Sequence, residues 1–367
     1  MLFWLFLFQP AVSYGEVHVL KSEILQTERT VWVARSQEAL PDQKLPVLYI
    51  LDGQTHFEMA ASLVRYLSAF NTIPPFLVVG LDNSQERERD LTPYQSNMSP
   101  NGGGAARYYQ YVTQEILPWV NRHYSTSGFQ ALAGKSYGGM FALFAAQQQD
   151  CPFQAVISVS PSLFLADNQM LKDVSDHVDQ VAQRRFLFLS HATEDDIMRI
   201  PFLQLSGFLA AHAQHRFHHH IYEAETHEST FQPALFDALK SLFDQWQVPR
   251  YVTQTDPQAV VQHYDRLISE LDLRIQIPFE ALKRTGRLMQ SSGFVEAARD
   301  VFLETIRRYP DSGYAEYFLA KALLKLGQSE SALAHMQLAV TKSKAAGDSD
   351  WQAMQEELTE IQNSISK

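Results

Sequence analysis

Short apolar segments alternate with amphipathic ones over about residues 16–250. From the third segment onward, most strand candidates are almost continuously apolar, as in VLYIL, FLVVG, AVISV and FLFLS. Such runs are typical of strands buried on both faces of a mostly parallel sheet. The predicted strands are 17–25, 30–34, 46–51, 76–81, 129–133, 155–158, 186–190 and 217–223. The predicted helices are 57–70, 105–123, 139–149, 200–215 and 232–246.

The order of these elements predicts the fold class. The first two strands lie close together in sequence, which favours an antiparallel hairpin. Eight strands with interleaved helices, the first pair forming a hairpin, predict an α/β protein with the α/β-hydrolase order. This domain is expected to occupy residues 16–249.

Residues 257–367 have the spacing of helices only and repeat with a period of 34 residues. Four pairs of residues 34 positions apart match in size. Three pairs are glycine or alanine and one pair is large and apolar: Gly293 and Gly327, Ala298 and Ala332, Gly286 and Ala320, and Phe302 and Met336. The pattern resembles the tetratricopeptide repeat, with Pro310 at the usual end of the first unit; an unrelated array of helical hairpins is the alternative. About three units are needed for stability. We therefore expect helices near 257–275 and 349–364 to complete the stack, or the first domain to cover one face. Such repeats would offer a surface for a protein partner.

Charge and cysteine content narrow the range of possible functions. The net charge is −11, and no basic stripe of the kind that nucleic acid binding requires is present, so we expect no nucleic acid partner. Cys151 is the single cysteine, which excludes a disulfide within the chain and favours a structural thiol.

The N-terminal segment MLFWLFLFQPAVSYG resembles the end of a signal peptide, with a cut after Ser13. It lacks a positively charged start, so a truncated start, a hydrophobic strand or an anchor are alternatives. We interpret residues 1–15 as a signal peptide remnant and expect export to the periplasm or the medium, with a cytoplasmic location left open. No other apolar run approaches membrane-spanning length, so no integral span is expected.

The segment Gly134-Lys135-Ser136-Tyr137-Gly138 contains the pattern G-x-S-x-G. An apolar strand precedes it and a helix pattern follows, as a nucleophile elbow requires. The interpretation makes Ser136 the nucleophile and the Tyr137 N–H an oxyanion donor. A glycine-rich turn without chemistry is the alternative.

A serine needs a base, and in this fold the base follows the last strand. His227 occupies that loop, directly before the last helix of the domain, and His191 is the second choice. The run 218–220 is three histidines, but consecutive strand residues alternate between faces, so we expect no metal site there.

The acid is expected in the loop after the strand 186–190, where three carboxylates compete. The preferred order is Asp195, then Glu194, then Asp196. A serine–histidine dyad, or an acid from elsewhere in the chain, is the alternative.

A second oxyanion donor is expected after the third strand, in Asp52-Gly53-Gln54. Gly53 would allow the backbone to approach the substrate, and the Gln54 N–H is the candidate donor. A simple turn is the alternative.

Six stretches in this order, VLYILDGQTHF, VVGLDN with RERDLTP, EILPWVNRHY, GKSYGGMFAL, SVSPSLF and THEST, resemble the "Putative esterase" family of α/β-hydrolases. The family includes esterase D-like and siderophore esterases, feruloyl esterases and mycolyltransferases, and RERDLTP is most similar to the siderophore-esterase branch. The resemblance covers about residues 16–248. It implies a serine esterase without metal or organic cofactor, with Ser136, His227, an acid among 194–196, and donors at Gln54 and Tyr137.

Two positions depart from the family pattern. Lys135 stands where the family more often has His, Gln or Met, and its side chain is expected to point away from the triad. Ala192 replaces the usual glycine before the acid, which keeps the choice of acid open.

The sequence says less about the substrate than about the catalytic residues. Only 91 positions separate Ser136 from His227, which leaves no room for a long lid and indicates an open site for short acyl chains or a bulky soluble ester. Arg87 and Arg89 are candidates for binding an anionic or catecholate substrate, or for pairing with Asp90 and other carboxylates. Rival functions are an acyltransferase or peptidase with the same triad, and a repeat-domain scaffold with a vestigial hydrolase.

Overall fold

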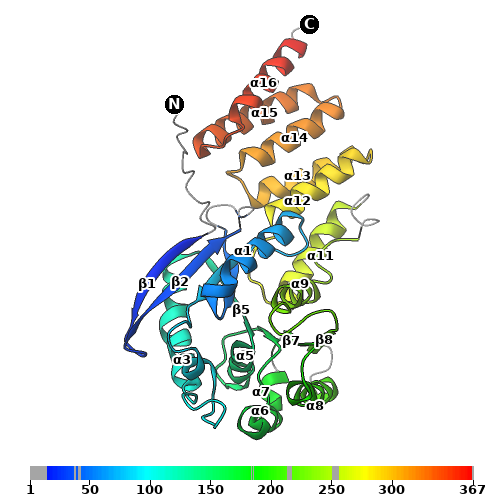
Figure 1. Ribbon diagram of the computed structural model, residues 1–367. Helices are drawn as coiled ribbons and strands as arrows, with labels where there is room; N and C mark the ends of the chain where they lie inside the picture. Colours follow the sequence, from blue (N-terminus) through cyan, green and yellow to red (C-terminus); the bar gives the residue numbers. More distant parts are fainter. Residues whose placement is uncertain are drawn as a thin grey trace, which may run out of the picture. The chain divides into compact units, whose positions relative to one another are not determined.

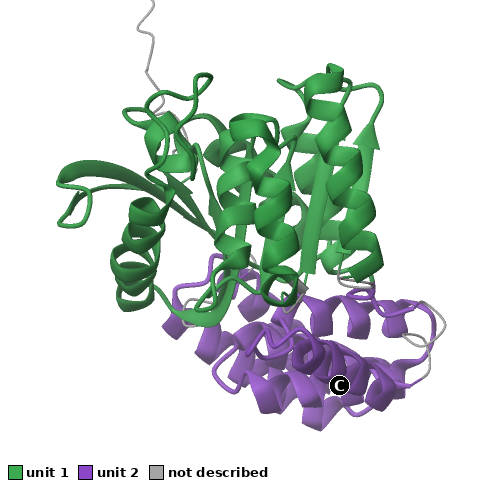
Figure 2. Cartoon of the chain, turned by 90° about the horizontal axis from the view of Figure 1, so that it is seen from below, with its two compact units in different colours: residues 1–37, 41–244 green, residues 38–40, 245–367 purple. Residues whose placement is uncertain are grey.

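The computed structural model describes residues 15–36, 39, 43–182, 184, 186–212, 217–249 and 256–365. The chain divides into two compact units, Met1–Gln37 with Pro41–Asp244, and Glu38–Leu40 with Gln245–Lys367 (Figure 2). The interpretation of the N-terminus as a signal peptide falls on residues 1–14, outside the described residues, so export stays a prediction.

Unit 1 is built on one eight-stranded sheet in the order β1-β2-β4-β3-β5-β6-β7-β8, flanked by helices (Figure 1). β1 pairs antiparallel with β2 and β2 with β4, whereas β4, β3, β5, β6, β7 and β8 pair in parallel. The predicted α/β-hydrolase fold class and its N-terminal hairpin are confirmed. The strands are β1 (Glu16–Ser22), β2 (Thr27–Arg35), β3 (Leu45–Ile50), β4 (Leu77–Leu81), β5 (Thr126–Lys135), β6 (Ala155–Val159), β7 (Phe186–Ala192) and β8 (Phe217–Tyr222).

The core of unit 1 lies along the central parallel strands. Every residue of β3, β4 and β6 is buried, as their continuously apolar sequences predict. α5 packs on β5 and β6, and α1 packs on β4 and contacts α9. Helices thus cover the central strands of the sheet.

The sequence pattern did not predict three helices of unit 1: the five-residue α2 and α7, and the 12-residue α6. α6 contains three residues with left-handed backbone angles, 166–168, so it departs from a regular helix there. The helices are α1 (Gly53–Ala69), α2 (Arg87–Leu91), α3 (Ala105–Tyr111), the π-helical turn η1 (Val112–Ile116), α4 (Leu117–His123), α5 (Tyr137–Gln147), α6 (Leu165–Asp176), α7 (Val178–Ala182), α8 (Asp196–His212) and α9 (Phe231–Leu242).

The described part of unit 2 is helical throughout. α12 and α14 begin 34 residues apart, and so do α13 and α15. The repeated positions Ala298, Ala332, Phe302 and Met336 are fully buried, which gives the 34-residue pattern its physical basis in helix packing. The elements are α11 (Pro257–Glu270), α12 (Phe279–Ser291), α13 (Val295–Arg308), α14 (Gly313–Lys325), α15 (Ser329–Ala346) and α16 (Trp351–Ile365).

Flanking helices accompany the two repeats as expected, because α11 packs on α13 and α16 packs on α15. The likeness to tetratricopeptide repeats stays a resemblance, and a protein partner for these helices stays a prediction.

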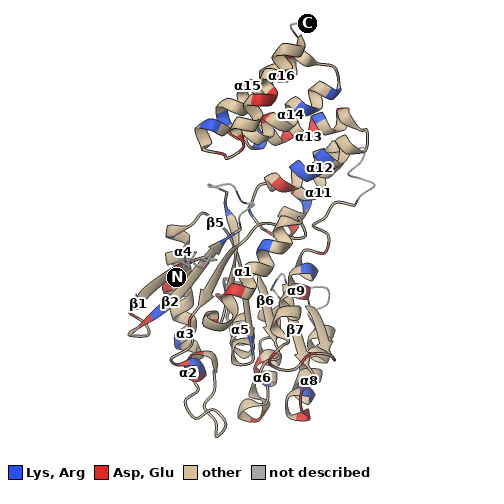
Figure 3. Ribbon diagram, turned by 45° about the horizontal axis from the view of Figure 1, so that its top comes forward, with Lys and Arg blue, Asp and Glu red and all other residues tan. Residues whose placement is uncertain are grey.

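Charges of both signs are interspersed along the elements of each unit, as on ordinary solvated faces (Figure 3). Within the described ranges, every helix falls short of the length or the apolar content that a membrane-spanning segment needs.

Candidate active site

Ser136 occupies the sharp bend between β5 and α5. Its backbone has φ 60° and ψ −117°, a region that residues with a Cβ rarely adopt. Three backbone hydrogen bonds hold it there: its N–H donates to Val159 O (2.9 Å), and its carbonyl accepts from Met140 N (3.0 Å) and Ser162 N (3.3 Å). The bend therefore has the strand–serine–helix geometry that the G-x-S-x-G pattern predicted.

Gly134 makes this bend sterically feasible, whereas Gly138 contributes less. A Cβ at position 134 would lie 2.5 Å from the backbone C and O of Gly138, and one at position 138 would lie 3.4 Å from Leu51 Cβ. Of the two glycines that flank Ser136 in the pattern, Gly134 is therefore the one that the bend requires.

We expect Gly134→Ala to lower the free energy of unfolding by about 1–3 kcal/mol, because backbone atoms must move to admit the methyl group. Gly138→Ala is the matched control. It should change stability by less than about 1 kcal/mol, since its Cβ meets only ordinary contacts and alanine favours a helix. Urea unfolding measures both values. Equal destabilisation by the two variants would contradict this account.

His227 lies in the loop between β8 and α9, and its Nδ1 is hydrogen-bonded to Glu194 Oε1. Glu194 follows β7, and its side chain is only 4% exposed. Its other oxygen, Oε2, lies 2.5 Å from Nδ1 of His191, a buried residue of β7. One carboxylate therefore sits between two imidazoles.

The surroundings of Glu194 make it a stable anion. Burial by itself raises the pKa of the carboxyl group, but the hydrogen bonds and charges of His191 and His227 outweigh it and lower that pKa to about 2. An ionised carboxylate on Nδ1 suits a histidine that accepts a proton on its other nitrogen.

The preference for Asp195 as the acid needs correction, because the structure brings Glu194 to His227. Asp195 is exposed, and its carbonyl accepts hydrogen bonds from Met198 N (2.9 Å) and Arg199 N (3.0 Å) as α8 begins. At the start of that helix the Glu194 side chain is buried and Asp195 is exposed. His191, the second choice for the base, pairs with Glu194.

The Ser136 hydroxyl lies 3.2 Å from Ser162 Oγ, and the described residues show no hydrogen bond between Ser136 and His227. Ser162 was not among the predicted site residues. Its only signal was the segment SVSPSLF, which begins at the end of β6. The Lys135 ammonium group donates to the carbonyl oxygen of His227 (2.9 Å), which brings the serine bend and the histidine loop together. The expectation that Lys135 points away from the triad is therefore wrong.

Gln54 and Tyr137 lie in the first turns of α1 and α5, which start at the ends of the neighbouring parallel strands β3 and β5. First-turn N–H groups have no acceptor within their helix and attract anions. Asn83 binds the start of α1 with two hydrogen bonds. Its N–H donates to Gln54 Oε1 (3.2 Å), and its Oδ1 accepts from Asp52 N (3.0 Å). Two candidate oxyanion donors thus share one sheet edge with Ser136.

The need for a glycine at position 53 comes from packing against a neighbouring strand rather than from the approach of substrate. A Cβ there would lie 2.7 Å from the backbone of Gly80 and Leu81 in β4. The absence of a side chain therefore lets α1 begin against the neighbouring strand.

Arg87 binds Asp52 with two hydrogen bonds of 2.8 Å, from Nε to Oδ1 and from Nη2 to Oδ2. Its guanidinium carbon also lies 5.1 Å from the ring centre of Tyr137. Asp52 is buried, with a left-handed φ of 52°, directly before α1. Arg87 thus supports the strained entry to the helix that carries Gln54.

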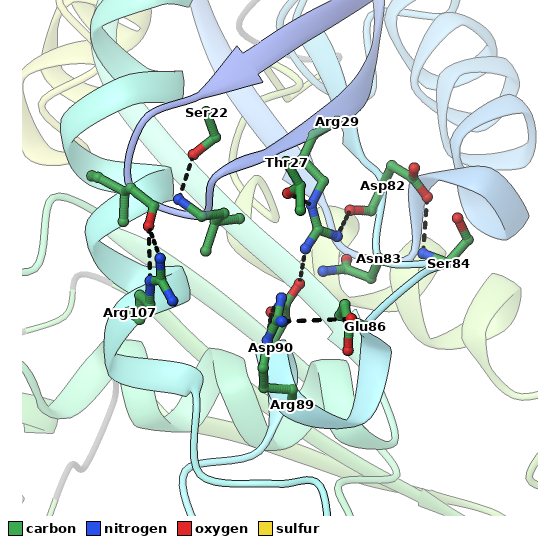
Figure 4. Close-up of polar contacts among 12 residues, drawn as sticks. Ser22, Thr27, Arg29, Asp82, Asn83, Ser84, Glu86, Arg89, Asp90 and Arg107 are labelled. Atoms are coloured by element: carbon green, nitrogen blue, oxygen red, sulfur yellow. Dashed lines mark hydrogen bonds and ion pairs between the residues drawn. The ribbon is translucent and has the colours of Figure 1, made fainter.

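Asp90 and Arg89 of the RERD segment take part in a chain of ion pairs with Arg29 and Glu86 (Figure 4). Arg29 Nη2 of β2 lies 2.6 Å from Asp90 Oδ2, and both side chains are at most 1% exposed. Arg89 contacts Asp90 Oδ1 at 2.8 Å and Glu86 at 3.6 Å. Both Arg87 and Arg89 are therefore paired with carboxylates of the chain, which was the alternative to substrate binding.

Comparison with known proteins agrees with this fold. The model of the "Putative esterase" family matches residues 22–242. Ferri-bacillibactin esterase BesA of Bacillus subtilis is 25% identical over 44% of this chain and 63% of the relative. Siderophore triacetylfusarinine C esterase of Aspergillus fumigatus is 28% identical over 33% of this chain and 45% of the relative. Iron(III) salmochelin esterase of Escherichia coli is 29% identical over 42% of this chain and 39% of the relative. The chain thus spans between 39% and 63% of the length of these relatives.

Solved structures share the fold. An IroE-like serine hydrolase from Shewanella oneidensis has a TM-score of 0.71 at 23% identity, covering 80% of this chain and 99% of that one. The BES protein from Bacillus cereus has a TM-score of 0.56 at 25% identity, covering 63% of this chain and 95% of that one. Because the family model spans more than half of the residues, this chain belongs to the "Putative esterase" family.

Proposed function

We propose that this chain is a serine esterase that hydrolyses carboxylic esters through an acyl-enzyme on Ser136, with His227 as general base and Glu194 as the orienting acid. The observation that carries the proposal is the strained Ser136, held at the end of β5 beside the loop on which His227 binds a buried carboxylate. Family membership supports the same reaction class.

The first step begins with a rotation of the Ser136 hydroxyl away from Ser162 and toward His227. Catalytic hydrogen bonds are often loose before substrate binds, so such a rotation is ordinary. His227 Nε2 takes the proton as Ser136 Oγ attacks the ester carbonyl carbon. The N–H groups of Gln54 and Tyr137 stabilise the resulting oxyanion.

The intermediate then collapses. The bond between the carbonyl carbon and the alkoxy oxygen breaks, His227 returns its proton to the departing alcohol, and the acyl group stays on Ser136. Water next gives a proton to His227 and attacks the acyl carbon. The bond between that carbon and Ser136 Oγ then breaks, His227 returns the proton to Oγ, and the acid is released. Glu194 remains ionised throughout and holds the His227 ring in one orientation.

We further propose esters of the siderophore type, or other bulky soluble esters, as substrates. The named relatives act on ferri-bacillibactin, triacetylfusarinine C and salmochelin, and these matches support the class. Transfer of the acyl group to an alcohol or amine is the alternative, since the acyl-enzyme is common to both.

The test is a panel of purified esters: p-nitrophenyl acetate, p-nitrophenyl butyrate, and a catecholate trilactone with and without Fe³⁺. We expect linear hydroxy-acid products from the trilactone by mass spectrometry, with kcat/KM of about 10⁴ M⁻¹s⁻¹ or higher. Turnover of aryl esters alone would reject the siderophore class. If glycerol is added and the main products are acyl esters of glycerol, the protein is a transferase. No turnover of any ester would reject the proposed serine esterase.

A further inference from the structure

We propose that Lys135 is a positioning residue that fixes the main chain of His227 relative to Ser136. The inference rests on the proposed function and adds to it a residue outside the triad and the oxyanion donors. Lys135 is the last residue of β5 and directly precedes Ser136 in the chain.

The Lys135 side chain is nearly buried, at 9% exposure, and its ammonium group has two partners. Nζ lies 2.9 Å from the carbonyl oxygen of His227 and 3.3 Å from Glu228 Oε2. The Glu228 side chain is 86% exposed, so water screens that ion pair and it contributes little. The carbonyl oxygen of His227 is therefore the partner that matters.

The strand that leads to Ser136, β5, is not paired with β8, the strand that leads to the His227 loop. β7 and β8 are neighbours, and Thr193 ties the acid loop to the base loop, with its N–H donating to Glu225 O (2.9 Å) and its hydroxyl to Glu223 O (2.8 Å). β5, however, is separated from β8 by β6 and β7. Among the described residues, Lys135 provides the hydrogen bond that joins the Ser136 bend to the His227 loop.

The chemistry of lysine suits this role. Burying an ammonium group is costly unless acceptors compensate it, so the contact strongly favours the loop position that supplies the carbonyl. A misplacement of about 1 Å between reacting groups lowers a rate by about 100-fold. A loop held only by its own hydrogen bonds would sample such displacements.

The experiment compares three variants of the full chain. Lys135→Met keeps the length and removes the donors, Lys135→Arg keeps the donors and the charge, and Glu228→Gln removes only the exposed partner. The measurements are the rate at which a fluorophosphonate labels Ser136, kcat and KM for p-nitrophenyl acetate, and Tm. We expect Lys135→Met to lower the labelling rate and kcat by about 10–100-fold, with KM changed less than threefold. Lys135→Arg should recover most of the loss, and Glu228→Gln should stay within twofold of the wild type.

The outcomes separate this inference from the proposed function. A wild-type chain that the fluorophosphonate does not label would reject the serine mechanism itself. A labelled wild type with a folded Lys135→Met variant of unchanged labelling rate and kcat would overturn the positioning role.

If Lys135→Met does not fold, the rate of fluorophosphonate labelling is measured for Lys135→Ala instead. Ethylammonium or tetramethylammonium is added to the solution at equal ionic strength, to replace the missing ammonium group. Recovery with ethylammonium alone supports the inference, because only that ion can donate to the carbonyl. No recovery with either ion would overturn it.

Discussion

Ser136→Ala is expected to abolish ester hydrolysis, with a loss in kcat of about 10⁶-fold. Alanine keeps the Cβ, so the backbone strain at φ 60° is the same and the fold should be retained. The substitution removes only the oxygen that would form the acyl-enzyme. Turnover of p-nitrophenyl acetate and fluorophosphonate labelling, followed by intact mass, measure the effect.

Ser162→Ala is the matched control for this prediction, because it removes the other hydroxyl of the 3.2 Å pair. Its kcat should stay within about tenfold of the wild type, since Ser162 would hold the Ser136 hydroxyl only in the resting state. If Ser136→Ala kept its activity and Ser162→Ala lost it, Ser162 would be the better candidate for the nucleophile.

Glu194→Gln is expected to lower kcat by about 10³–10⁴-fold, because an amide next to Nδ1 neither stabilises the imidazolium nor specifies the required tautomer. Asp195→Asn, at the exposed neighbouring position, should stay within twofold of the wild type. Steady-state kinetics on an aryl ester distinguish the two. A larger loss from Asp195→Asn would restore the original preference for that residue.

The same substitution has a second readout in the pH dependence of stability. The pKa of Glu194 is lowered from 4.5 to about 2, so its ionisation stabilises the folded state above about pH 4.5. That contribution is lost as the pH falls from about 4.5 to 2. Glu194→Gln should therefore show a smaller fall in Tm across this interval than the wild type, and an equal fall would contradict the buried anion.

Local signals in the sequence determined the framework of unit 1. Continuously apolar runs predicted β3, β4 and β6, because a strand covered on both faces has no polar positions. The G-x-S-x-G pattern placed the bend at Ser136, since a Cβ at position 134 would collide with the backbone of Gly138, four residues further along the chain. In unit 2, the 34-residue spacing predicted buried small and large residues such as Ala298 and Phe302, which helix packing requires.

Only the tertiary structure decided which side chains of the site meet. Glu194 rather than Asp195 contacts His227, although the two carboxylates are neighbours in the sequence. Lys135 reaches a carbonyl 92 residues away, a contact that no local pattern encodes. Side-chain directions in loops depend on partners that are distant in sequence, whereas strands and helices follow from the spacing of neighbouring residues.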